Sequence, residues 1–398
     1  MTEIIGNWLE EHPQVLGNES NRAYQNIYAM QDDRTITAGM ACRTFGFRTP
    51  GDDGAGQYII SSTGTANGKD VIELENGLFA TLVIGKIINV KSLGAYGDGT
   101  HDDSEIMVYA ISLLSDGKAI FFPSGIYIHG DGETGENGTG NSYTPTGSGN
   151  LYYHDSEHPV NIGRDIRLKI NNLNNIAIYG EQGSIIRSNA GNGECRNNEI
   201  FSFTNCNGIL LKNLVIDGNR ANRGLYLADS DYGGYNQRGN IRIIGCNRVI
   251  IDNVQSINSG MDGAYIGVSN IENVKTKSTN IYISRSNFEN AHRNGLSIAG
   301  CEYVFINETI TSDAGKSGES YGGTKPKACV DIEADYTSQP NNCIFISGMK
   351  ALGAAGTYSI WVAARAHNVY IDKTTIDKDT YTSETDTSNI NISTINLS

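Results

Sequence analysis

The segment 87–129 constrains the fold of this chain more than any other part of the sequence. A short β-run leads into a glycine-punctuated loop, 94–99. Asp102 and Asp103 follow, and their side-chain oxygens can accept hydrogen bonds from the first free N–H groups of a helix. Apolar residues then recur at helical spacing until Gly117, and a second β-run ends in a Pro-Ser-Gly turn. This order predicts strand, loop, helix and strand in succession.

The same block resembles the opening signature of the pectate-lyase-like parallel β-helix proteins. Their usual motif, GA-x-GDG-x-x-DDT followed by a helix and FP-x-G-x-Y, stands here as GAYGDGTHDDS and FPSGIY, with Ser104 in place of the usual Thr. The resemblance implies an all-β fold, a right-handed parallel β-helix whose N-terminal end is capped by the helix. It also implies that the two adjacent Asp residues are structural rather than catalytic.

Short β-runs recur along the chain after Leu173. Their starts lie about 23–25 residues apart where nothing is inserted and about 32–40 apart where a loop intervenes. The shorter spacing is the length of one coil in a solenoid whose strands stack ~4.8 Å apart. Asn213 and Asn253 occupy equivalent turn positions, where we expect their side-chain amides to pair. The first runs of successive coils begin at Asn175, Gly208, Arg248, Asn280, Tyr303, Cys343 and Asn368.

The seven cysteines are predicted to be free thiols. Cys206, Cys246 and Cys301 each stand two residues before the first run of a coil, and Ser278 occupies this position in the coil between the last two. A small residue that recurs at one turn is expected to pack inside a solenoid, with Cys acting as a small hydrophobe. The number of cysteines is odd, and the sequence has neither a CxxC pair nor zinc-finger spacing.

Two segments that flank the repeat are predicted to be separate units. Residues 1–86, in which 4–9 can form a short helix, resemble the head segment of phage tail appendage proteins, with Asp53 replacing a Gly of the usual GDGG pattern. We expect a small α+β head module here that attaches to other phage tail proteins or nucleates a trimer. The β-helix is assigned to 87–378. Residues 379–398 lack a Gly-bounded repeat and are predicted to be a frayed tail or a final interchain strand.

Composition limits the possible partners. The formal net charge of −14, without a basic stripe, argues against nucleic acid binding. The chain has no apolar segment long enough to cross a membrane, and its first residues lack the basic and apolar regions of a signal peptide. A tailspike-like protein without a secretion signal is expected on a virion tail, outside the cell after host lysis, and usually as a homotrimer.

A second β-run in most coils is predicted to form one outer face of the solenoid. Aromatic rings stack well on the C–H faces of sugars, so Tyr226, Tyr265 and Trp361 are expected to bind a glycan in a shallow groove. The alternative is ordinary strand composition, since Tyr and Trp favour strands. The first outward column reads Tyr226, Tyr265, Ser297, Asp331 and Trp361, and the next reads Ala228, Gly267, Ala299, Glu333 and Ala363.

Asp331 and Glu333 are the main catalytic candidates. They stand at i and i+2 of one predicted strand, so both face outward with Cα atoms roughly 6.6 Å apart. Carboxyl separations of ~5 to ~9.5 Å span retaining and inverting glycosidases, in which one carboxyl is the acid and the other the base or nucleophile. The segment resembles a GIDIEP-type run of phage and gut-bacterial β-helix proteins, with Cys329 for Gly and Ala334 for Pro. The alternative is a pair of solvated carboxylates.

Neighbouring coils are expected to add residues to the same cleft. Asp262 and His292 are predicted to be catalytic, His292 because imidazole transfers protons near neutral pH. Arg293 can hold a uronate or a phosphate with its paired donors, and Arg223 stands at the same edge as a further substrate-binding residue. A histidine in a turn is otherwise simply exposed.

These features predict a tailspike-like depolymerase that binds and hydrolyses a bacterial surface polysaccharide, such as an exopolysaccharide or teichoic acid, without a cofactor. Two alternatives remain open. The first is a polysaccharide lyase that uses Arg293 or a Lys as base and a calcium ion near a uronate. The second is a non-catalytic spike that binds its glycan receptor without cleaving it.

Overall fold

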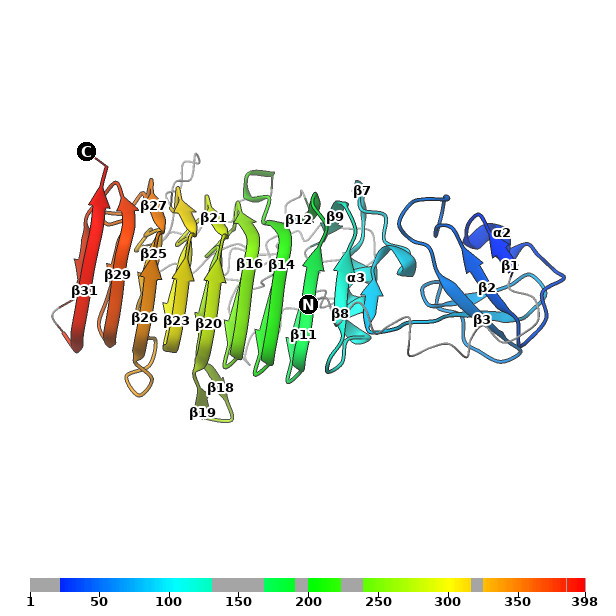
Figure 1. The fold of residues 1–398 in the computed structure, drawn as a ribbon, viewed down its shortest axis with the longest axis horizontal. Helices are drawn as coiled ribbons and strands as arrows, with labels where there is room; N and C mark the ends of the chain where they lie inside the picture. The colour runs from blue at the N-terminus through cyan, green and yellow to red at the C-terminus, as the bar shows by residue number, and fades with distance from the viewer. Residues whose placement is uncertain are drawn as a thin grey trace, which may run out of the picture.

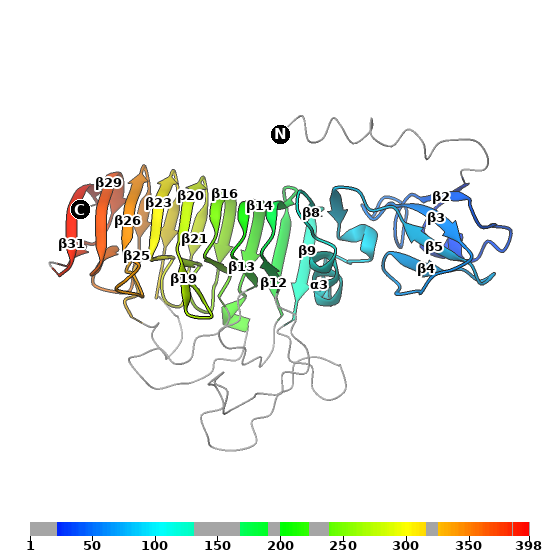
Figure 2. The ribbon, with the colours of Figure 1, turned by 90° about the horizontal axis from the view of Figure 1, so that it is seen from below.

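The computed structural model describes residues 22–130, 168–189, 200–222, 239–315, 325–383 and 385–397. In these ranges a small sheet lies at one end of a long row of stacked strands (Figure 1). Figure 2 shows the same elongated arrangement from below. No helix in the described ranges has the length and apolar character needed to cross a membrane. The helix expected at 4–9 lies outside these ranges.

The N-terminal sheet has five strands in the order β1-β2-β3-β5-β4. Alternation in β3 buries Tyr58 and Ile60 against Met30 of the adjoining helix, so one face of the sheet forms the core of the head. Asn26 caps that helix through a bond from the Ala29 N–H at 2.9 Å. The elements are β1 (Arg22–Tyr24), α2 (Ile27–Gln31), β2 (Ala41–Thr44), β3 (Gln57–Ser61), β4 (Val71–Glu73) and β5 (Phe79–Leu82).

The next segment confirms the predicted order of strand, loop, helix and strand. It comprises β6 (Ile87–Asn89), the 3-10 helix η2 (Lys91–Leu93), β7 (Asp98–Asp102), α3 (Ser104–Ser112), β8 (Ala119–Phe122) and β9 (Gly125–His129). Only Asp102 accepts from the start of α3, at 2.9 Å from the Ser104 N–H. Asp103 turns back to the glycine loop and accepts from the N–H groups of Tyr96 at 2.6 Å and Gly97 at 2.9 Å. Both carboxylates therefore hold backbone in place.

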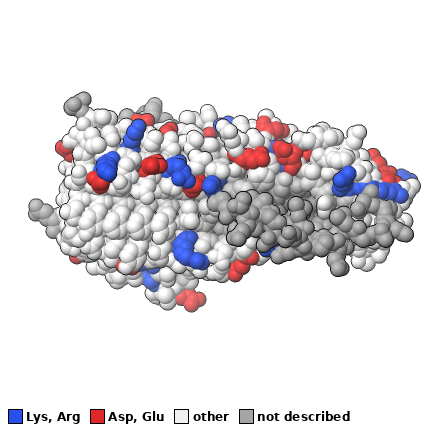
Figure 3. Space-filling view, viewed as in Figure 1, with Lys and Arg blue, Asp and Glu red and all other residues white. Residues whose placement is uncertain are grey.

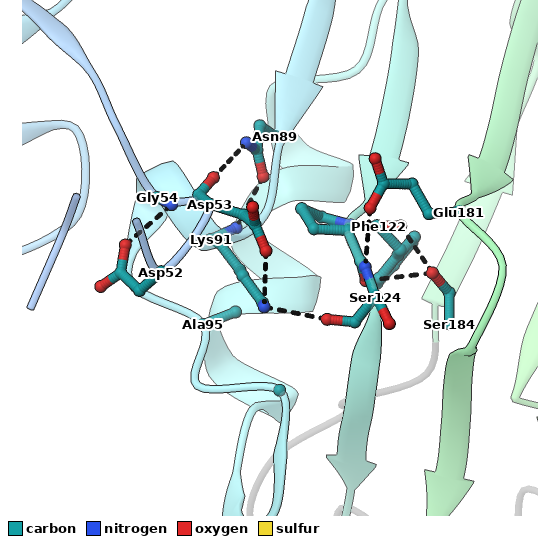
Figure 4. A network of polar contacts seen from close by, with 12 residues as sticks. Asp52, Asp53, Gly54, Asn89, Lys91, Ala95, Phe122, Ser124, Glu181 and Ser184 are labelled. Atoms are coloured by element: carbon teal, nitrogen blue, oxygen red, sulfur yellow. Dashed lines mark hydrogen bonds and ion pairs between the residues drawn. The ribbon is translucent and has the colours of Figure 1, made fainter. Parts of the chain in front are cut away.

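A polar network joins the head to the first coils (Figure 4). Lys91 Nζ lies 3.4 Å from Asp53 Oδ2 and donates to the Ser124 carbonyl at 2.9 Å. Asn89 Nδ2 donates to the Asp53 carbonyl at 2.8 Å, and Ser124 N donates to Glu181 at 3.2 Å. Asp53, which replaces the usual Gly, keeps the left-handed backbone with φ of 62°. The substituted residue therefore preserves the turn and adds an ion pair to the junction.

Two parallel sheets form the solenoid, whose coils stack along the long axis (Figure 1). The larger sheet has 16 strands and the smaller has eight. Besides β6 to β9, the larger sheet contains β11 (Asn174–Gly180), β12 (Ser184–Ser188), β14 (Asn207–Asp217), β16 (Asn247–Ile257), β20 (Ser278–Ser284), β21 (Asn287–Glu289), β23 (Cys301–Asn307), β24 (Ile310–Ser312), β26 (Asn341–Ser347), β27 (Lys350–Leu352), β29 (Ala366–Ile376) and β31 (Thr387–Asn396).

The eight-stranded sheet carries Tyr265 and Trp361, two of the residues predicted to bind substrate. Its strands, in spatial order, are β10 (Leu168–Asn171), β13 (Phe201–Thr204), β15 (Ile241–Ile244), β17 (Ala264–Gly267), β22 (Leu296–Ala299), β25 (Val330–Ile332), β28 (Ile360–Val362) and β30 (Thr380–Thr382). Outside the two sheets, η3 (Arg220–Asn222) follows β14, and a hairpin of β18 (Ser269–Ile271) and β19 (Val274–Thr276) follows β17. Inward residues of successive strands, such as Ile266, Ile298 and Ile332, are fully buried in one continuous core.

The predicted inner stack of small residues is confirmed. The Cys206 N–H donates to the Cys246 sulfur at 3.4 Å, and the Cys246 N–H donates to Ser278 Oγ at 3.2 Å. These cysteines and Cys301 are buried and unbridged. Cys246 and Ser278 therefore each accept a hydrogen bond from a backbone N–H group of the preceding coil. Among the turns, Asn253 Nδ2 donates to Asn213 Oδ1 at 2.9 Å, as the sequence predicts.

The segment predicted to be a tail continues the solenoid instead. Strand β30 pairs in parallel with β28, and β31 pairs in parallel with β29. Ile390 and Ile392 align with Val369 and Ile371 of the preceding coil and pack against the core. This coil has no bounding glycine, which is why its repeat is hidden in the sequence. The β-helix therefore extends to Asn396 rather than ending at Lys378.

Candidate functional site

Strand pairing defines one outward column on the eight-stranded sheet. In register, it runs through Lys169, Ser202, Arg242, Tyr265, Ser297, Asp331, Trp361 and Tyr381. The order from Tyr265 to Trp361 is the predicted one. The position before Tyr265 is occupied by Arg242, whereas the sequence analysis predicts Tyr226 there. The strand that pairs with β17 is β15, which comes immediately before β16 in the chain rather than immediately after β14. Tyr226 and Arg223 lie outside the described residues.

Asp331 and Glu333 occupy opposite environments. Asp331 is only 7% exposed, whereas Glu333 lies just beyond the end of β25 and is exposed. Asp331 Oδ2 accepts a hydrogen bond from Asn294 Nδ2 at 3.0 Å, but Oδ1 is buried and has no hydrogen-bond partner within the described ranges. The two carboxyl groups are therefore not equivalent, although both belong to the same outer face.

Burial raises the pKa of Asp331 to about 8. Loss of hydration is the largest cause, because it penalises the charged form. The nearby positive charge of Arg293 lowers the pKa, while the negative charges of Glu333, Asp262 and Asp335 raise it. Asp331 is therefore mainly a neutral carboxylic acid at pH 7, as a general acid must be.

Asp262 and Arg293 form a buried ion pair. Arg293 Nε and Nη2 donate to the two oxygens of Asp262 at 2.7 and 2.5 Å, and the Asn294 N–H donates to Oδ1 at 3.1 Å. Burial disfavours the charge on Arg293, but Asp262 outweighs this effect, so the pKa of Arg293 lies above its ordinary value. Both Asp262 oxygens and two Arg293 nitrogens are thus engaged within the protein. Asp262 therefore holds Arg293 beside Asp331. The two Arg293 donors that the sequence analysis expected to bind a substrate anion are already bonded to Asp262.

His292 does not titrate near neutral pH, which differs from the sequence-based prediction. Burial lowers its pKa to about 4, and the positive charges of Arg220 and Lys327 act in the same direction. Its Nδ1 atom is buried, and no described residue forms a hydrogen bond with it. The imidazole is consequently neutral at pH 7 and has no proton-transfer equilibrium near that pH.

Two of the three aromatic residues in this column, Tyr265 and Trp361, have different neighbours. The Tyr265 ring lies against Gly267, since a Cβ on Gly267 would come within 2.9 Å of it, and its hydroxyl donates to Asp335 Oδ2. Trp361 stacks on Tyr381 with 4.2 Å between ring centroids, and Tyr358 lies 5.5 Å from Trp361. Trp361 therefore belongs to an aromatic cluster beside Asp331, whereas Tyr265 lies against Gly267 and is bonded to Asp335.

The sequence analysis missed four contributors to this site: Asn294, Asp335, Tyr358 and Tyr381. Tyr381 continues the alternation of the outward column but falls in the coil that lacks a bounding glycine. Asn294 and Asp335 act through contacts with other coils, which only the coil register shows. Within the described ranges, no group of three or more His, Cys, Asp or Glu side chains is placed to hold a metal ion.

No protein-family model and no curated protein matches this sequence. Among solved structures, a tailspike protein of the Acinetobacter baumannii bacteriophage Fri1, described as a capsular polysaccharide depolymerase, superposes with a TM-score of 0.50 at 11% identity. That alignment covers 94% of this chain and 69% of the tailspike. A pre-mature form of bacteriophage phi29 gene product 12 superposes with a TM-score of 0.48 at 16% identity, over 73% of this chain.

The present chain spans about a third (33%) of the length of the phi29 protein. The Pantoea stewartii protein WceF, a glycan biofilm modifying enzyme with a tailspike-like fold, has a TM-score of 0.41 at 12% identity, over 92% of this chain and 49% of that one. The likeness to the Fri1 tailspike concerns the fold. In its fold, the chain is a tailspike-like parallel β-helix protein.

Proposed function

We propose that this protein is a tailspike-like depolymerase that binds and hydrolyses a bacterial surface glycan, either an exopolysaccharide or a teichoic acid. The observation that carries the proposal is a buried carboxyl group with a raised pKa, Asp331, beside an exposed carboxylate, Glu333. An acid and a base held in different environments are what glycoside hydrolysis requires. The shared fold with a phage tailspike described as a capsular polysaccharide depolymerase supports the choice of substrate.

In this mechanism Asp331 donates its proton to the glycosidic oxygen as the bond between the two sugars breaks. Glu333 either attacks the anomeric carbon or activates a water molecule, depending on the separation of the carboxyl groups in the substrate complex. Asp331 Oδ1 is buried, so substrate binding must displace the side chains that cover it. The cluster of Trp361, Tyr358 and Tyr381 offers an apolar surface for the neighbouring sugar.

A non-catalytic glycan-binding spike is the second candidate. The burial of Asp331 Oδ1 and the engagement of both Asp262 oxygens favour it, because a binding protein needs no accessible acid. A lyase that uses Arg293 as its base is disfavoured, since Asp262 strengthens the hold of Arg293 on its proton. A lyase reaction would require another base.

Incubation with purified capsule, exopolysaccharide and teichoic acid fractions separates these functions. New reducing ends without ultraviolet absorbance from unsaturated uronates are the expected result and indicate hydrolysis. A parallel rise in that absorbance would indicate a lyase. Co-sedimentation with one fraction without any cleavage would establish a binding spike and contradict the proposed hydrolysis.

We further propose a homotrimer carried on a virion tail, with the head module, which contains β1 to β5, attached to other tail proteins. On the 16-stranded sheet, Tyr282, Phe305, Phe345 and Tyr370 stack ring on ring, with 5.1 to 5.2 Å between successive centroids. Few charged residues lie over this part of the sheet (Figure 3). An apolar aromatic stripe along one face is typical of a surface that another subunit covers.

A further inference from the structure

Asn294 is completely buried and links three successive coils. Its backbone N–H donates to Asp262 Oδ1 at 3.1 Å, in the preceding coil. Its side-chain Nδ2 donates to Ser297 Oγ at 3.1 Å and to Asp331 Oδ2 at 3.0 Å. Its side-chain oxygen accepts from the Ala328 N–H at 3.0 Å, in the following coil. Every hydrogen-bonding atom of Asn294's amide side chain therefore has a partner.

These contacts leave the amide of Asn294 only one orientation. The Ala328 backbone can only donate to it, so the atom that faces Ala328 must be the amide oxygen. The nitrogen then faces Asp331, and its two hydrogens are directed to Ser297 Oγ and to Asp331 Oδ2. An oxygen that faces an N–H donor accepts a hydrogen bond and is poorly placed to carry a proton.

We propose that Asn294 is a positioning residue that confines the acid proton of Asp331 to Oδ1, the carboxyl oxygen that has no hydrogen-bond partner among the described residues. The proposal rests on the proposed function for what the proton does next. The Oδ1–H bond breaks, the proton joins the glycosidic oxygen, and the electron pair remains on Asp331. Asn294 keeps its bond to Oδ2 throughout and stabilises the carboxylate that forms.

The charged groups around Asp331 do not explain why its proton would be on Oδ1 rather than on Oδ2. Glu333 and Asp335 lie on its own segment, Arg293 lies on the preceding coil, and Asp262 lies on the coil before that. All four alter the energy of the charged carboxylate as a whole. Among the described residues, only Asn294 donates a hydrogen bond to one oxygen of Asp331 rather than the other. Removal of the Asn294 amide therefore isolates its effect.

Infrared difference spectroscopy of the intact protein tests this placement without any substrate. Subtraction of the Asp331→Asn spectrum isolates the protonated carboxyl band of Asp331. In Asn294→Leu, or in Asn294→Ala if the leucine variant does not fold, we expect this band at higher frequency, because the C=O group has lost its hydrogen bond. We also expect the band to disappear at a higher pH than in the wild type, since that bond favours the carboxylate.

The matched control is Asn240→Leu. Asn240 is another buried asparagine with three hydrogen bonds at the edge of the same sheet, and its partners are Ile216, Ser256 and Ile257. This variant should lose stability but leave the Asp331 band unchanged. The inference is contradicted if the frequency of the Asp331 carboxyl band is unchanged in both Asn294 variants. It is also contradicted if the band shifts by the same amount in Asn240→Leu, because Asn294 would then have no specific effect on the position of the Asp331 proton.

The activity assay separates this inference from the proposed function. If Asp331→Asn cleaves the glycan normally, the proposed function fails, while the infrared result still decides where the proton lies. If Asp331→Asn is inactive, Asn294→Ala should lower kcat about 10- to 100-fold, as small misplacements of catalytic groups do, with little change in KM. The alkaline limb of its pH profile should move to higher pH. An unchanged pH profile would contradict the inference.

Discussion

At the scale of single residues, the alternation of the chain determines which side chains face outward but not how deeply they lie. Asp331 and Glu333 stand two residues apart, and the sequence predicts that both face the groove. The structure buries one and exposes the other, because Asp331 lies under contacts from the coil that contains Asn294. Such contacts depend on which loop residues of one coil meet the next. Strand periodicity carries no information about them.

The buried Asp331 should make the stability of the protein depend on pH. Its pKa is about 8 in the folded state and near the ordinary value of 3.8 when unfolded, so the folded state holds the proton more tightly. Its contribution to stability is therefore complete below about pH 4 and is lost as the pH rises through about 8. We expect the free energy of unfolding of the wild type to decline relative to that of Asp331→Asn, by at most ~1.4 kcal/mol per pH unit.

Urea unfolding of both proteins between about pH 5 and 8 measures this difference. The comparison cancels the contributions of groups that the two proteins share, including His292. A difference that stays constant over this pH range would show that Asp331 has an ordinary pKa and would remove the main support for its role as an acid.

Trp361 should contribute to binding rather than to chemistry. We expect Trp361→Ala to raise KM several-fold, up to about 10-fold, with kcat nearly unchanged, because a stacked aromatic pair contributes ~0.5–1.5 kcal/mol. Phe345→Ala, in the aromatic stack of the other sheet, is the matched control and should leave KM unchanged. A fall in kcat at constant KM would instead place Trp361 in the catalytic step.

At the scale of elements, the sequence predicts the coils wherever glycine or asparagine marks their turns. The cap and the repeats from Asn175 to Asn368 lie where the pattern places them. The pattern fails at β15 and β31. Strand β15 follows the inserted segment 223–238, so its pairing partner cannot be identified by spacing alone. Strand β31 lacks a bounding glycine, and only its register with β29 reveals another coil.

In the stack of Cys206, Cys246 and Ser278, we expect Cys246 to tolerate substitution by serine better than substitution by alanine. Cys246→Ser keeps an acceptor for the Cys206 N–H, and Ser278 already fills this position in the next coil. We therefore expect its free energy of unfolding to lie close to that of the wild type. Cys246→Ala leaves a buried N–H without its acceptor and should lose about 1–3 kcal/mol.

Chemical denaturation of the two Cys246 variants measures the difference. Equal stability of the serine and alanine variants would show that the contact between coils at this position contributes nothing.

At the scale of the whole molecule, the sequence predicts an elongated solenoid behind a small head, and the structure has this arrangement (Figure 1). The sequence analysis did not identify the aromatic stack, although each of its four rings stands two residues after the start of a predicted run. Tyr282, Phe305, Phe345 and Tyr370 come together only when these coils are in register. How this face associates with other chains depends on surfaces that one chain does not contain.

Light scattering tests the proposed trimer. At micromolar concentration we expect a mass near three times the 43.0 kDa of one chain. Phe305→Asp with Phe345→Asp should shift the mass toward that of a monomer, because charges on the stack would be buried at the interface. A wild-type mass near that of a single chain would contradict the trimer.

The central claim is that Asp331 supplies the proton for hydrolysis of a glycan. The most direct test measures the rate of reducing-end release from the fraction that the wild type cleaves, using Asp331→Asn. Glu302→Gln, on the other sheet, is the control. The account predicts at least a ~10²-fold loss of rate for Asp331→Asn, with an unchanged circular dichroism spectrum and retained glycan binding, and a normal rate for Glu302→Gln. Full activity of Asp331→Asn would contradict the account.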